Sequence, residues 1–69
     1  MAMVGRVVNW DSKHGIGLIR ADMSDETLFF HVRDMDLGAQ PPYISERVAF
    51  DAERDMSGCA MALHIMPVR

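Results

Sequence analysis

Few side chains in this sequence are of the types that do covalent chemistry, and they are not spaced as in a catalytic or metal site. His14, His31 and His64 show no metal-ligand spacing, either among themselves or with the single cysteine, Cys59. The sequence contains neither a glycine-rich phosphate loop nor a nucleophile motif. Carboxylates in the turn-forming stretches are expected to be solvated or to accept turn hydrogen bonds: Asp11, Asp25, Glu26 and Asp36. We therefore expect no catalytic residue, no metal and no cofactor, and a protein that is not an enzyme.

A second kind of chemistry is the stacking of flat side chains on nucleic-acid bases. Trp10, Phe29 and His31 have flat rings and lie in short apolar segments. An exposed ring that stacks on a base contributes ~1–3 kcal/mol, and cations along a groove hold the phosphates. The net charge of −3 and the pI near 5.4 give no general basic field. Nucleic-acid binding would therefore need a local arrangement of rings and cations.

The composition is that of a small globular domain, 49% hydrophobic and 25% charged over 69 residues. We expect one domain, covering residues 1–69. A lone cysteine allows no internal disulfide, which fits a reducing compartment. No apolar run approaches the ~20 residues of a membrane span, and the first residues lack the features of a signal peptide. These features predict a cytoplasmic protein without a membrane partner.

Short apolar segments alternate with turn signals along the chain, and none shows a sustained helical stripe. The longer loop between 33 and 45 has room for a short helical turn near 33–35. In the fourth segment, alternation places Val48, Phe50 and Ala52 inward. The pattern favours an all-β fold, a five-stranded antiparallel OB-fold barrel with few exposed edges. The expected strands are 6–10, 16–20, 27–32, 47–53 and 59–65.

Several segments together resemble a cold-shock domain. Residues 15–19, Gly-Ile-Gly-Leu-Ile, resemble the first ribonucleoprotein motif of that family, usually Lys-Gly-Phe-Gly-Phe-Ile. Residues 28–32, Leu-Phe-Phe-His-Val, resemble the second, usually Val-Phe-Val-His-Phe. Residues 5–11 align without gaps to Gly-Lys-Val-Lys-Trp-Phe-Asn, and 48–50 are similar to the Val-x-Phe strand. The resemblance covers about Val4 to Ile65 and implies a divergent cold-shock domain.

The likeness is closer to a variant cold-shock domain that in many bacteria precedes a small membrane domain of unknown function. That variant tends to carry Trp-Asn/Asp, Phe-Phe-His and Arg-Asp-x-x-Gly. Residues 10–11, 29–31 and 54–58 match these three motifs. No membrane domain follows in this sequence, so the resemblance implies either a free-standing relative or an excised fragment.

The resemblance implies binding of single-stranded RNA or DNA on the face of the second and third strands. If Ile19, Leu28 and Phe30 point into the barrel, alternation turns four side chains outward: Ile16, Leu18, Phe29 and His31. The family's usual rings are missing at several aligned positions, where this chain has Asn9, Ile16, Leu18 and Val32, and the usual lysine is Val8. We therefore expect weak binding. The candidate nucleic-acid-binding residues are Trp10, Lys13, His14, Ile16, Leu18, Phe29, His31 and Arg33.

Each candidate also has an ordinary structural explanation. Trp10 is either a stacking ring or a rim residue that seals the barrel, and Lys13 and His14 either contact phosphate or solvate a turn. Arg6, Arg20 and Arg33 are candidates for a positive rim. Tyr43 is a candidate for a late aromatic contact, whereas His64 is expected on the surface. Alternatively, the apolar face binds a protein partner or forms a homodimer, through Val8, Ile16, Leu18, Phe29 and Val32. A third alternative is a barrel that no longer binds anything strongly.

Overall fold

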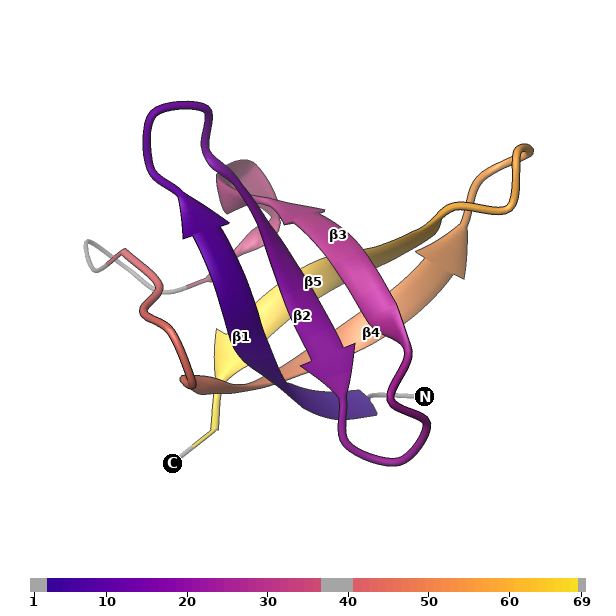
Figure 1. Ribbon diagram of the computed structural model, residues 1–69, viewed down its shortest axis with the longest axis horizontal. Coiled ribbons are helices and arrows are strands. Elements are labelled where there is room, and N and C mark those ends of the chain that lie inside the picture. The colour runs from indigo at the N-terminus through magenta and orange to yellow at the C-terminus, as the bar shows by residue number, and fades with distance from the viewer. Residues whose placement is uncertain (1–2, 37–40, 69) are drawn as a thin grey trace.

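Five strands and one short 3-10 helix make up the computed structural model, which describes residues 3–36 and 41–68 (Figure 1). The expected strands are present, with ends shifted by a few residues. Val32, expected in the third strand, instead begins the helix η1, close to the expected helical turn. No helix in the described residues is both long and apolar enough to cross a membrane. The elements are β1 (Met3–Asp11), β2 (Ile16–Ala21), β3 (Thr27–His31), η1 (Val32–Asp34), β4 (Arg47–Arg54) and β5 (Ala60–Pro67).

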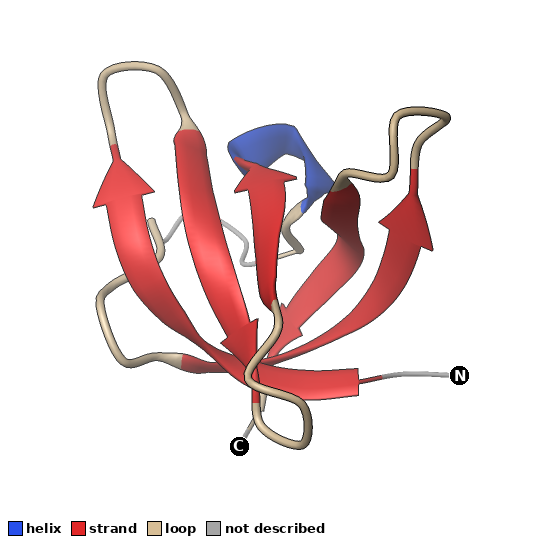
Figure 2. Ribbon diagram, turned by 45° about the vertical axis from the view of Figure 1, so that its right-hand side comes forward, coloured by secondary structure: helices blue, strands red, loops and turns tan. Residues whose placement is uncertain are grey.

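The strands close into a barrel in the order β1-β2-β3-β5-β4, with β4 pairing back onto β1. In Figure 1, β1, β2 and β3 lie in front of β4 and β5. All neighbouring strands are antiparallel except β3 and β5, which run parallel and are in register at Phe29 and Met61. The expected OB-type barrel is thus confirmed, with one parallel seam in place of an all-antiparallel sheet. The helix η1 lies at one end of this barrel, directly after β3 (Figure 2).

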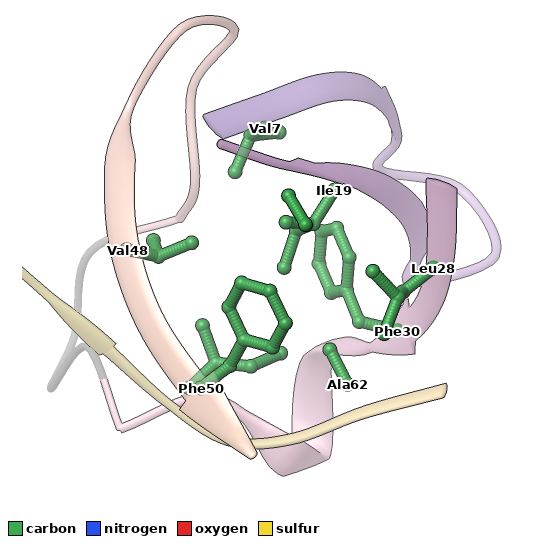
Figure 3. Packing of buried hydrophobic residues seen from close by; sticks show 9 residues of the cluster. Val7, Ile19, Leu28, Phe30, Val48, Phe50 and Ala62 are labelled. Carbon is green, nitrogen blue, oxygen red and sulfur yellow. The ribbon is translucent and has the colours of Figure 1, made fainter. Parts of the chain in front are cut away.

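Only apolar side chains fill the interior of the barrel among the described residues (Figure 3). The inward positions expected for five side chains are confirmed, because each is almost completely buried: Ile19, Leu28, Phe30, Val48 and Phe50. Ala52 is exposed, although its partner on β5, Ala62, belongs to the core. The register shift between Ala49 and Asp51 adds a residue to β5 rather than to β4, because two steps along β4 lie opposite three along β5. The core consists of Val7, Ile19, Ala21, Leu28, Phe30, Val48, Phe50, Ala62 and Ile65.

A β-bulge in β1 decides which side chains of this strand face outward. Val7 pairs with Ile19, but the next pair is Asn9 with Leu18, so Val8 has no partner on β2. A bulge of this kind adds one residue to a strand and reverses its alternation beyond that point. Asn9 therefore lies on the outer face of the barrel, and Trp10 on the inner side.

Candidate nucleic-acid interface

Two cross-strand pairs form the centre of the candidate site on the outer face of β2 and β3. The register places Ile16 opposite His31 and Leu18 opposite Phe29. Ile16 is 43% exposed and Phe29 is 51% exposed, while Leu18 and His31 are half-buried. Directly opposite residues in antiparallel strands have Cβ atoms ~5 Å apart. The four side chains thus form one continuous surface, which we call the outer patch.

The outer patch continues onto β1 through polar side chains. Asn9 is in register with Leu18, and Asp11 with Ile16. A shallow hollow of about 310 Å³ lies along this junction. Its lining consists of Asn9, Asp11, His14, Ile16, Gly17, Leu18 and Phe29. The exposed ring of Phe29 therefore borders a hollow that also offers an amide and a carboxylate.

Trp10 is separate from the outer patch. It is half-buried and packs against the core, and its ring stacks on that of Phe30 with centroids 5.8 Å apart and planes inclined by 3°. The bulge at Val8 is the reason, because it turns Trp10 to the inner side of β1. Of the two explanations drawn from the sequence, this placement favours a rim residue that seals the barrel.

Gly17 occupies the position in β2 that is in register with Trp10 on one side and Phe30 on the other. A Cβ atom at this position would overlap the Phe30 ring and the carbonyl oxygen of Asn9. Glycine within a strand often marks such a close approach. The absence of a side chain at Gly17 thus lets the Phe30 ring lie directly beneath the strand that carries half of the outer patch.

A hydrogen bond to the backbone fixes the imidazole of His31. Its Nδ1 atom accepts the backbone N–H of Arg33 at 3.1 Å, which caps the start of η1. Because a backbone N–H can only donate, Nδ1 carries no proton, and the neutral ring has its proton on Nε2. His31 thus contributes a flat ring and one N–H donor to the outer patch. The Arg33 side chain instead borders a second hollow, together with Asp34, Met35, Asp36, His64 and Met66.

The turn between β1 and β2 is organised by Asp11. Its Oδ1 atom accepts the backbone N–H groups of Lys13 and His14 at 3.0 and 3.3 Å, and its Oδ2 atom lies 2.8 Å from Nδ1 of His14. The hydrogen bond from the His14 ring is the main cause that lowers the pKa of Asp11. His14 is thereby held at the border of the hollow beside Ile16, while Lys13 is exposed in the same turn.

The structure thus brings together five of the predicted site residues and separates two others from them. His14 and the outer patch share one face, with Lys13 in the adjoining turn, whereas Trp10 points inward and the side chain of Arg33 lies elsewhere. Sequence reasoning did not place Asn9 and Asp11 on this face. The available signal was the one-residue offset between Trp10 and the family's usual tryptophan. No group of three histidine, cysteine or carboxylate side chains could hold a metal ion in residues 3–36 and 41–68.

Comparison with known proteins supports a fold but no sequence family. No family model matches the chain, and no curated protein matches it. Among solved structures, 35 chains match, including one described as "drosophila Unr CSD456". The similarity to that structure has a TM-score of 0.84 at 20% sequence identity, and it covers 100% of this chain but only 27% of the other. The chain therefore has the fold of a cold-shock domain, a five-stranded barrel of the OB type.

Proposed function

We propose that this chain binds single-stranded RNA or DNA through the outer patch, weakly and with modest sequence preference. The observation that carries the proposal is the register that sets Leu18 opposite Phe29 and Ile16 opposite His31 on the outer face. Single-strand binders of the OB type use such a face as a platform for unpaired bases. The cold-shock fold adds support, because domains of this architecture commonly hold single strands.

Each side chain of the patch has a distinct part in the proposed binding. The exposed ring of Phe29 stacks on one base, and His31 stacks or donates its Nε2–H to a base acceptor. Leu18 and Ile16 make aliphatic contact with the bases. An aromatic ring at either position would contribute ~1–3 kcal/mol of stacking. Lys13, exposed in the adjoining turn, attracts a phosphate. With few rings and a net charge of −3, we expect micromolar or weaker affinity that falls as salt is added.

The proposed role is binding without a chemical reaction, in the cytoplasm and without a cofactor. The closer likeness to the variant cold-shock domain stays a prediction, based on residues 10–11, 29–31 and 54–58. That variant in many bacteria precedes a membrane domain, so the proposed binding module is either free-standing or one part of a longer protein.

An amide chemical-shift titration with hexameric oligothymidine and oligouridine at low salt tests the proposal. We expect the shifts to cluster on residues 16–18 and 29–31. Phe29→Ala should weaken binding by roughly 5-fold or more, the loss of ~1 kcal/mol of stacking. Met66→Ala is the matched control, because Met66 on β5 is 52% exposed, similar to Phe29 at 51%.

Two results would count against the proposal. The first is an absence of shifts at high micromolar oligonucleotide, and the second is a set of shifts remote from β2 and β3. If the same amides instead shift with protein concentration alone, the outer patch is a homodimer surface, and sedimentation would then show the dimer.

A further inference from the structure

Three arginines from three neighbouring strands lie side by side on the barrel surface. The register pairs Arg6 of β1 with Arg20 of β2 on one side and with Arg47 of β4 on the other. All three residues are exposed. We call Arg47, Arg6 and Arg20 the arginine row. The sequence suggested Arg6 and Arg20 for a positive rim, but the placement of Arg6 between Arg20 and Arg47 arises only when β1 pairs with both neighbours.

Like charges directly opposite each other on adjacent strands destabilise a sheet. The described residues offset this repulsion only in part. Nη2 of Arg47 lies 2.9 Å from Oδ2 of Asp22, and Nη1 of Arg6 donates to the carbonyl oxygen of Ser45 at 3.2 Å. Among the described residues, one carboxylate, that of Asp22, thus forms an ion pair with one of the three guanidinium groups of the row. In a chain with a net charge of −3, the row is a local concentration of positive charge.

The arginine row lies next to the outer patch along the same strands. On β2 the outward positions are Ile16, Leu18 and then Arg20, so Arg20 lies about 7 Å beyond Leu18. On β3, Thr27 is in register with Arg20, so it lies beyond Phe29 at the same end of the sheet. A single strand that stacks on the outer patch and continues toward the end of β2 therefore reaches the arginine row.

We propose that the arginine row binds the phosphodiester backbone of a single strand, beyond the nucleotides that stack on the outer patch. The guanidinium group presents a planar fork of donors that matches phosphate oxygens. A phosphate placed between Arg6 and Arg20 also relieves the repulsion between them. This inference rests on the proposed function, because it assigns the path that the bound strand follows.

The test compares oligothymidylates of three and eight nucleotides on the wild type and on the double variant Arg6→Gln/Arg20→Gln. The trimer is short enough to occupy the outer patch alone, whereas the octamer also reaches the arginine row. Each phosphate contact adds ~0.7 to the slope of log affinity against log salt concentration. With this slope, one phosphate contact makes the affinity about 8-fold higher in 50 mM salt than in 1 M salt. We expect the double variant to lower the octamer slope by ~1.4 and to leave the trimer slope unchanged.

Arg54→Gln is the matched control, because Arg54 lies at the other end of β4 from Arg47 and pairs with Glu26. Thermal unfolding verifies that each variant is folded.

An unchanged octamer slope in the double variant, with wild-type shifts still on residues 16–18 and 29–31, overturns this inference and leaves the proposed function intact. An equal loss for trimer and octamer overturns it too, because the arginines then act only through the general field. If an eight-base-pair duplex shifts the amides of Arg6 and Arg20 as strongly as the octamer, the assignment to a single strand is wrong. Absence of any wild-type binding overturns both proposals.

Discussion

The indole ring of Trp10 lies parallel to the buried ring of Phe30, with centroids 5.8 Å apart and planes inclined by 3°. Phe30 is 1% exposed, so one face of the indole is packed against the core. Aromatic pairs with this offset geometry contribute ~0.5–1.5 kcal/mol beyond the area that they bury. The single tryptophan of the chain is thus placed to report on folding.

Replacing Trp10 should therefore change stability far more than nucleic-acid binding. We expect Trp10→Ala to lower the free energy of unfolding by about 2–4 kcal/mol, because it removes the stack and opens a cavity above Phe30. Trp10→Phe should retain most of that stability and bind an oligonucleotide as the wild type does. Urea denaturation followed by circular dichroism measures the first effect, and an oligonucleotide titration measures the second. Weakened binding by the folded Trp10→Phe variant would place this ring in the interface instead.

The close approach of Gly17 to Phe30 leads to a second prediction. Gly17→Ala should destabilise the barrel by about 1–3 kcal/mol, because the new methyl group overlaps the Phe30 ring and the Asn9 carbonyl. Phe30→Leu removes the overlapping ring atoms, so the double variant should lose less stability than the sum of the two single losses. A double-mutant cycle by urea denaturation measures this coupling. Strict additivity would show that the overlap with Phe30 is not what makes Gly17 necessary.

How far the sequence predicts this fold depends on where the strands are regular. In β2 and β3 the ladder is unbroken, so simple alternation correctly assigned Ile19 and Phe30 to the core and Leu18 and Phe29 to the surface. In β1 the bulge at Val8 turns Trp10 to the inner side, and the sequence had left two explanations open for this residue. A bulge depends on how a strand pairs with its neighbour, and the alternation within one strand does not reveal it.

The arginine row shows a different limit of sequence reasoning. Arg6, Arg20 and Arg47 are far apart in the chain, and their strands were all predicted. That Arg6 lies between the other two follows from the registers of two separate ladders. A register error of one residue would move a side chain to the other face of the sheet. A map of the charged surface therefore needs the three-dimensional structure even when every strand has been found.

The hydrogen bonds of Asp11 give a third prediction, which concerns pH. The His14 ring, the largest cause, holds the pKa of Asp11 below its usual value of 3.8. The carboxylate form is therefore favoured by folding, so its contribution to stability is complete above pH ~4 and is lost as the pH falls through the pKa of Asp11 in the folded protein. His14→Ala should raise this pKa toward 3.8. Carboxyl-carbon NMR titration measures it.

Asp55 supplies an internal control for this titration. Its pKa is also lowered, through hydrogen bonds from the Ser57 hydroxyl and the backbone N–H of Cys59. These partners lie in the turn between β4 and β5, remote in the chain from His14. The pKa of Asp55 should stay low in His14→Ala. If both carboxyl groups shifted together, the cause would be a general change in the fold rather than the loss of one hydrogen bond.

Asn9 offers a test in which binding is gained. It lies on the outer face in one row with Leu18 and Phe29, at the position that aligns with the usual tryptophan of cold-shock domains. Asn9→Trp should add one stacked base, and ~1–3 kcal/mol corresponds to an affinity increase of about 5- to 160-fold for a single-stranded oligonucleotide. Ala52→Trp is the matched control, since Ala52 is exposed on β4 and a ring there lies outside the outer patch. Equal gains from both variants would show that any added exposed ring increases affinity. No gain from Asn9→Trp in a folded protein would mean that bases do not lie over the row of Asn9, Leu18 and Phe29.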